Sequence, residues 1–198
     1  MKVPGTALTQ DSVSPGKRPL IISISGVSGG GKTTFTKHMS KSVPGSAALH
    51  FDDYELEGPE DICEWIERGG DPAEWKLEPL LADLLHFIEQ DWVEYVWLDY
   101  PFGRDYPALA GLIDLTVFVD TPLDIALARR ILRDCPQASA EEILADLTGY
   151  LKRGRPAYLH MLENTRPRSD LPIDGTLSVE EMAGLLLATD LIKRRGSR

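Results

Sequence analysis

Cysteine is scarce in this sequence, with only Cys63 and Cys135 among 198 residues. The two stand far apart, and neither belongs to a C-x-x-C pair or to a cluster of cysteine and histidine. A disulfide framework needs several cysteines and a structural zinc site needs closely spaced ligands, so the sequence favours neither. We expect two free thiols in a reducing compartment and predict a cytoplasmic protein.

Long apolar runs are also missing. No stretch approaches the ~18 uncharged apolar residues of a membrane-spanning helix. The first residues, MKVPGTALTQDSVSPGKRP, contain no apolar core of a secretory signal. We therefore predict no membrane partner. Because Pro, Gly, Ser and Thr dominate this segment, we expect residues 1–18 to form a flexible leader.

Basic residues are outnumbered, with 21 Lys and Arg against 31 Asp and Glu and a formal net charge of −10. Proteins bind nucleic acids largely through Lys and Arg that neutralise phosphates, so this balance predicts no nucleic-acid partner. This excess of acidic residues is still compatible with a small anionic ligand bound in a local basic pocket. The length and a hydrophobic content of 42% fit one α/β domain, which we predict for residues 19–198.

Glycine, in contrast, is concentrated in residues 26–34, GVSGGGKTT, which carry the spacing G-x-x-x-x-G-K-T. A β-branched run precedes this stretch and a helix-compatible run follows it, the context of a phosphate-binding P-loop and not of a linker. Glycines let backbone N–H groups point at phosphates. Lys32 would reach the β- and γ-phosphates, and Thr33 would offer its hydroxyl to Mg²⁺. We predict ATP and Mg²⁺ as cofactors, with nucleotide contacts from Gly26, Ser28, Gly29, Gly30, Gly31, Lys32, Thr33 and Thr34.

Short apolar segments alternate with helical patterns along the chain. They predict strands at residues 20–25, 47–51, 93–98, 115–119 and 170–173, with Pro172 interrupting the last. This alternation predicts an α/β fold, with a parallel sheet covered by helices on both sides. Capping boxes at Ser139 and Ser178 predict the starts of the last two long helices, and Thr121 is expected to cap the helix that Pro122 begins.

Acidic residues follow three of the predicted strands. Asp52 and Asp53 follow the second, Asp99 ends the third and Asp120 ends the fourth. Ligands bind at the carboxyl ends of parallel strands, so these positions are candidate site residues. Asp99, closing the apolar run before it, is predicted to hold Mg²⁺ together with Thr33. Asp120 is better interpreted as a turn residue before the next helix.

The P-loop, LHFDDYE, GGDPAEW and VFVDTPLDIALARRILRD together resemble the uridine kinase, nicotinamide riboside kinase and phosphoribulokinase-like family of P-loop small-molecule kinases. The resemblance covers residues from about 20 to 190. It implies a three-layer α/β/α P-loop NTPase fold with a five-stranded parallel sheet and a helical lid. It implies an aspartate near the acceptor hydroxyl, which Asp52 matches, and lid arginines, which Arg130 and Arg133 match best. With Lys32 they form the predicted catalytic set.

The chain departs from that family at two places. Asp99-Tyr100 stands where Glu-Gly is common, and the second arginine cluster after the lid helix is absent. Arg153 and Arg155 either supply the missing charge or lie at an exposed helix end, and the sequence leaves both readings open. Candidate acceptor-pocket residues are Asp53, Tyr54, Tyr100, Phe102 and Arg104, with core or surface packing as the alternative for each.

The predicted function is ATP- and Mg²⁺-dependent transfer of the γ-phosphoryl group to a hydroxyl of a small metabolite, such as a nucleoside, riboside or sugar. The alternatives are a nucleotide-binding switch and a non-catalytic nucleotide-binding protein. No guanine-reading N-K-x-D sequence is present, which disfavours a GTPase switch. Intact Lys32, Thr33, Asp52 and Asp99 disfavour a decayed enzyme. The sequence leaves open the acceptor, the choice between Asp52 and Asp53 as the base, and whether the protein is a monomer or a homodimer.

Overall fold

The computed structural model describes residues 18–196, so the predicted leader lies outside the described residues except for its last position. The described part contains one parallel sheet with strand order β2-β3-β1-β4-β5. Its strands are β1 (Leu20–Ser25), β2 (Ser46–His50), β3 (Tyr95–Asp99), β4 (Leu115–Asp120) and β5 (Leu171–Asp174). All five predicted strands are therefore confirmed, with end shifts of one or two residues.

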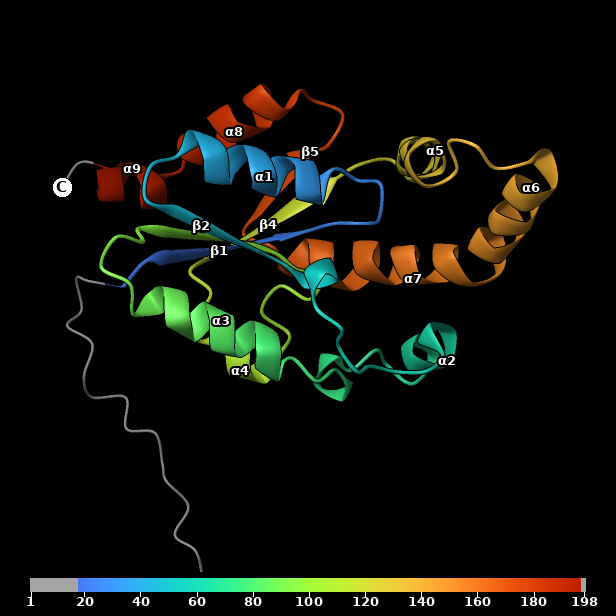
Figure 1. The fold of residues 1–198 in the computed structure, drawn as a ribbon, viewed down its shortest axis with the longest axis horizontal. Coiled ribbons are helices and arrows are strands. Elements are labelled where there is room, and N and C mark those ends of the chain that lie inside the picture. The colour runs from blue at the N-terminus through green and yellow to red at the C-terminus, as the bar shows by residue number, and fades with distance from the viewer. Residues whose placement is uncertain (1–17, 197–198) are drawn as a thin grey trace, which may run out of the picture.

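Helices connect these strands (Figure 1). They are α1 (Lys32–Ser42), α2 (Ile62–Glu67), α3 (Glu78–Ile88), α4 (Pro107–Ala110), α5 (Leu123–Asp134), α6 (Ala140–Gly149), α7 (Arg155–His160), α8 (Val179–Leu187) and α9 (Asp190–Gly196). Short 3₁₀ turns occupy Phe51–Asp53, Pro72–Glu74 and Arg166–Arg168. No helix between residues 18 and 196 has the length and apolar character that a membrane crossing requires.

The sheet separates two apolar clusters, one on each face. On one face, Phe35 and Met39 of α1 pack with Met182 of α8 against the central strands. On the other, Leu80 and Leu84 of α3 pack against β2 and β3. Figure 1 shows α1 and α8 above the sheet and α3 below it. This confirms the predicted three-layer α/β/α architecture, which follows because strands buried on both faces need helices on both sides.

One long helical arm leaves this core. From Ala140 to Thr165 the chain is helical throughout, because π-helical turns at Tyr150–Gly154 and Met161–Thr165 continue α6 into α7 and beyond it. Figure 1 shows α5 and α6 extending to one side, with the arm running back to the sheet above α2. The last π-helical turn widens the helix where it reaches the carboxyl end of the sheet. Such turns are frequent at functional sites.

The caps agree with the sequence at two helices and differ at a third. Capping boxes are formed at Ser139 of α6 and Ser178 of α8, as predicted. The predicted cap at Thr121 is wrong, because Pro122 occupies the cap position of α5 without a side-chain bond. The Thr121 hydroxyl instead donates a 2.7 Å hydrogen bond to the carbonyl of Gly30. Thr121 therefore ties the end of β4 to the glycine-rich loop.

Candidate active site

The glycine-rich loop lies between β1 and α1, and α1 begins at Lys32. Gly29 and Gly31 have φ angles of +79° and +104°, in the region that side chains disfavour. A Cβ at Gly29 would overlap the Ala126 carbonyl of α5, whereas a Cβ at Gly31 would meet no atom within 4 Å. Glycine is thus required at position 29 because a side chain would clash with α5. At position 31 there is space for a side chain, and glycine is required by the positive φ angle. The loop has the geometry of a phosphate cradle at a helix N-terminus.

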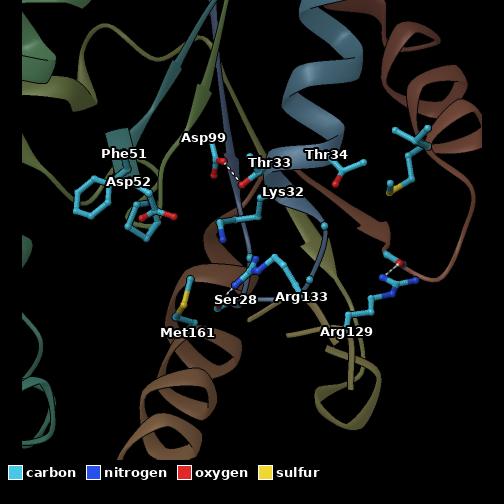
Figure 2. A pocket seen from close by; sticks show the side chains of 18 of the residues that line it. Ser28, Lys32, Thr33, Thr34, Phe51, Asp52, Asp99, Arg129, Arg133 and Met161 are labelled. Carbon is cyan, nitrogen blue, oxygen red and sulfur yellow. Dashed lines mark hydrogen bonds between the residues drawn. The ribbon is translucent and has the colours of Figure 1, made fainter. Parts of the chain in front are cut away.

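This loop forms the floor of a cavity of about 590 Å³ (Figure 2). The predicted residues that line it are Gly26, Ser28, Gly29, Gly30, Gly31, Lys32, Thr33, Thr34, Asp52, Asp99 and Arg133. Figure 2 shows Lys32 between Thr33 and Ser28, with Arg133 across from it and Asp52 on the side of β2. Three elements distant in sequence therefore bring cationic and anionic side chains around one space. We call it the nucleotide cavity.

Thr33 and Asp99 meet at one end of the nucleotide cavity. The Thr33 hydroxyl donates a 2.6 Å hydrogen bond to Asp99 Oδ2, and Asp99 is buried. The sequence analysis did not identify His50, whose Nδ1 lies 3.3 Å from the same carboxylate oxygen. His50 and Asp99 are register neighbours at the ends of β2 and β3. The hydroxyl and carboxylate oxygens are ligand types that Mg²⁺ prefers, so this pair fits the predicted metal.

Asp52 and Asp53 separate in space although they are adjacent in sequence. Both lie in the exposed 3₁₀ turn Phe51–Asp53 directly after β2. Asp52 lines the nucleotide cavity and Asp53 does not. The hydrogen bond to Asp134 is the main cause of the raised pKa of Arg133. The carboxylate of Asp52 is close enough to Arg133 to make a smaller contribution in the same direction. Of the two aspartates, only Asp52 therefore lies at the nucleotide cavity.

The three arginines of α5 take different directions. Arg133 Nη2 lies 3.4 Å from Ser28 Oγ and lines the nucleotide cavity. Arg129, which was not among the predicted site residues, also lines it and donates a 2.9 Å hydrogen bond to the Gly175 carbonyl. Arg130, a predicted catalytic residue, does not line the nucleotide cavity, and its side chain forms a bidentate pair with Asp146 of α6. Arg130 therefore joins two helices of the lid.

A second cavity of about 580 Å³ adjoins the first, and both are lined by Phe51, Pro101 and Met161. One wall is aromatic: Trp65, Trp75, Phe51 and Phe102 contact one another, with ring centroids between 5.3 Å and 6.5 Å apart. The opposite wall comes from the turn after β3 and from the helical arm, and it is polar: Asp105, Tyr158, His160, Asn164 and Arg168. We call this space the acceptor cavity.

Most predicted acceptor residues lie elsewhere. Tyr54 donates a 2.7 Å hydrogen bond to Asp83 of α3, and Asp53 lines neither cavity. Tyr100 is fully buried in the core, and this burial raises the pKa of its hydroxyl. Arg104 bonds the carbonyls of Ile113 and Asp114 and pairs with Asp170. Of the five candidates only Phe102 lines the acceptor cavity.

Arg153 and Arg155 are exposed and line neither cavity. The alternative of an exposed helical surface is therefore the one that the structure supports. Tyr158, which the sequence did not single out, lines the acceptor cavity. Its hydroxyl is close enough to Ser28 of the glycine-rich loop for hydrogen bonding with Ser28 to affect its pKa. Burial raises the pKa of the Tyr158 hydroxyl, and the bond to Ser28 acts in the opposite direction.

Comparisons with known proteins extend these observations. No model of a protein family matches the chain. The chain is 25% identical over 180 residues to a uridine kinase of Ligilactobacillus salivarius, an alignment covering 78% of this chain and 84% of that protein. It is 26% identical over 183 residues to a uridine kinase of Staphylococcus aureus, covering 79% and 88% of the two chains.

The fold has a counterpart among solved structures. A gluconokinase from Sinorhizobium meliloti 1021 superposes with a TM-score of 0.50 at 19% identity, covering 90% of this chain and 98% of that one. At this identity the likeness concerns the fold alone. The chain is thus similar in sequence to uridine kinases, and its P-loop α/β/α fold is like that of a solved kinase structure.

Proposed function

We propose that this protein transfers the γ-phosphoryl group of ATP, with Mg²⁺, to a hydroxyl group of a small acceptor bound in the acceptor cavity. The observation that carries this proposal is the junction of the two cavities at Phe51, Pro101 and Met161, with Asp52 at the edge. Phosphoryl transfer needs two substrates in line and charge stabilisation more than covalent catalysis. Two adjoining cavities with a P-loop in one of them suit that requirement.

The nucleotide cavity has two chemically different ends. Lys32 and the loop N–H groups lie at the end near Asp52, where they would bind the phosphates. Leu177, Val179 and Met182 line the other end, close to Gly175 and Arg129. An apolar end beside an arginine suits a flat, partly apolar base, so the cavity fits a nucleoside triphosphate along its length.

Thr33 and Asp99 would hold Mg²⁺, and His50 would keep the Asp99 carboxylate in place. When bound, the metal supplies positive charge next to the transferring group. Lys32 would supply further positive charge at the β- and γ-phosphates, and Arg133 would do so from the lid. Arg133 reaches the loop through Ser28, so movement of α5 would bring its charge to the phosphates.

Asp52 would act on the acceptor. In this role its carboxylate would accept a hydrogen bond from the acceptor hydroxyl and orient the oxygen toward the γ-phosphorus. It would take up the proton as the bond from that oxygen to phosphorus forms, while the bond from the γ-phosphorus to the β,γ-bridging oxygen breaks and ADP leaves. The turn that holds Asp52 also places Phe51 in both cavities. In the proposed complex, Phe51 and Asp52 would therefore lie beside both the acceptor and the nucleotide.

The curated relatives named above are uridine kinases, which favours a nucleoside or a compound of similar size as the acceptor. A coupled ADP-release screen over nucleosides, sugars and vitamin precursors tests the proposal. We expect at least one acceptor to stimulate ADP release above the rate with ATP alone, and Lys32→Ala to abolish that stimulation while the far-ultraviolet circular dichroism stays unchanged. Stimulation that survives Lys32→Ala would exclude the P-loop as the reacting site.

A further inference from the structure

The acceptor cavity contains one carboxylate that no part of the proposed transfer step uses. Asp105 lies in the turn after β3, and its side chain, 25% exposed, lines the polar wall. It lines the acceptor cavity but not the nucleotide cavity, so it lies away from the phosphates. The inference drawn from it rests on the proposed function.

The guanidinium group on the polar wall of the acceptor cavity is already paired with a carboxylate. Arg168 Nη1 lies 3.1 Å from Asp105 Oδ1, and Arg168 Nε donates a 2.7 Å hydrogen bond to the Asn164 carbonyl. Asn164 Nδ2 lies 3.2 Å from His160 Nδ1. Among the described lining residues, Arg168 is the one permanent cation, and a carboxylate balances it.

A second carboxylate adds negative charge to the same space. Asp71 also lines the acceptor cavity, and its Oδ1 accepts a 2.9 Å hydrogen bond from the backbone N–H of Ala73. Asp71, Asp105 and Arg168 together give the described lining a formal charge of −1, counting two carboxylates against one guanidinium. A negatively charged ligand group would therefore meet net repulsion in a partly desolvated space.

We propose that Asp105 is the specificity-determining residue of the acceptor cavity, accepting a hydrogen bond from an N–H or O–H group at the non-reacting end of the acceptor. The acceptor is then an uncharged or cationic ring compound that rests on the Trp65 and Trp75 side of the cavity, and an anionic group at that end excludes binding. Burial raises the pKa of the Asp105 carboxyl, and Arg168 and, to a smaller extent, His160 lower it, in keeping with a partly desolvated carboxylate beside Arg168.

Three matched probe pairs test this specificity, each comparing a neutral compound with a carboxylated counterpart: uridine with 5-carboxyuridine, glucose with glucuronate, and pyridoxine with 4-pyridoxate. Calorimetric titrations use the full chain saturated with Mg²⁺ and the β,γ-imido analogue of ATP, so that no transfer occurs. We expect a neutral member to bind and its carboxylated counterpart to bind roughly tenfold more weakly or worse. Equal or tighter binding of a carboxylated member, or no binding by any neutral member, would overturn the proposal.

Two variants separate a recognition role from a structural one. Asp105→Asn removes the negative charge and releases Arg168, so the preference for the neutral member should shrink or reverse. Arg168→Gln removes the cation and leaves Asp105, so the same preference should grow. If Asp105 serves only to hold Arg168, both variants will change the preference alike, which contradicts the proposal. A failure of the proposed transfer would instead appear in the ADP-release screen, since these titrations measure binding alone.

Discussion

The guanidinium group of Arg130 faces the carboxylate of Asp146 across two lid helices, with Nη1 3.1 Å from Oδ1 and Nη2 bonded to Oδ2. The two side chains are 15% and 32% exposed. The hydrogen bond to Arg130 lowers the pKa of Asp146, despite the opposing effect of burial. The pair fixes α5 to α6, so Arg129 and Arg133 are presented to the nucleotide cavity from a braced helix.

We predict that Asp146→Asn lowers the free energy of unfolding by about 1–2 kcal/mol, a value between those of exposed and buried pairs. Because the folded pKa of Asp146 lies below the ordinary value, its stabilisation is present above that value and is lost as the pH falls through the folded pKa. Urea denaturation at pH 7 and at several values down to about pH 2 checks this. The free energies of unfolding of the wild type and the variant should become equal at the lowest pH. A difference between them that increases as the pH falls would contradict the role assigned to Asp146.

We predict that Arg133→Ala lowers kcat by roughly 10³-fold, because a lid arginine stabilises charge mainly in the transition state. Arg129→Ala is the matched control on the same helix. Its side chain bonds the Gly175 carbonyl at the other end of the cavity, so its loss should chiefly raise the KM for ATP. Steady-state kinetics of both variants provide the test. An Arg133→Ala enzyme with wild-type kcat would mean that this side chain is only a solvated helix residue.

We predict that Asp99→Asn weakens the Mg²⁺ dependence of nucleotide binding. Even groups that only support a metal ligand typically contribute about 10–100-fold to metal affinity, so the Mg²⁺ concentration needed for half-maximal binding should rise at least about tenfold. His50→Gln changes the side chain that contacts the Asp99 carboxylate and leaves the carboxylate itself intact, so it should raise this Mg²⁺ concentration less. Titration of Mg²⁺ at fixed nucleotide concentration measures both. An unchanged midpoint in Asp99→Asn would remove Asp99 from the metal site.

We predict that Tyr158→Phe lowers kcat/KM for the acceptor by about fivefold, the effect of one hydrogen bond of ~1 kcal/mol. The ring stays to line the acceptor cavity, whereas the bond to Ser28 is lost. Affinity for the nucleotide alone should change little. Tyr150→Phe, a change at the neighbouring ring 5.7 Å away, is the control. Equal effects of the two variants would argue against a link through Ser28.

The sequence predicted the parts of the fold that local pattern determines. The glycine spacing, the β-branched strands and the capping boxes each depend on residues close together, and β1 and the caps at Ser139 and Ser178 are where the sequence placed them. Thr121 is the exception among the caps, because its hydroxyl binds Gly30, a partner 91 positions away in the chain. No local signal reveals such a partner.

The site was predictable only where it follows a motif. The family resemblance indicated Arg130 and Arg133 as lid arginines, but the direction of the Arg130 side chain depends on its pairing with Asp146, which no helix periodicity reveals. Tyr100 follows Asp99 directly, yet it points into the core while Asp99 meets Thr33. The acceptor cavity depends on the helical arm passing over α2, a tertiary contact between segments almost 100 residues apart in sequence, as Gly70 and His160 illustrate.

The most direct test of the account is a single-turnover measurement of γ-phosphoryl transfer from labelled ATP to the acceptor found in the ADP-release screen, in Asp52→Asn and Asp53→Asn side by side. Asparagine keeps the size of the side chain but cannot take up the proton, and of these two aspartates only Asp52 lines the nucleotide cavity. The account predicts that Asp52→Asn binds Mg·ATP nearly as wild type does but transfers no phosphoryl group, whereas Asp53→Asn stays active. Full transfer by Asp52→Asn would contradict it.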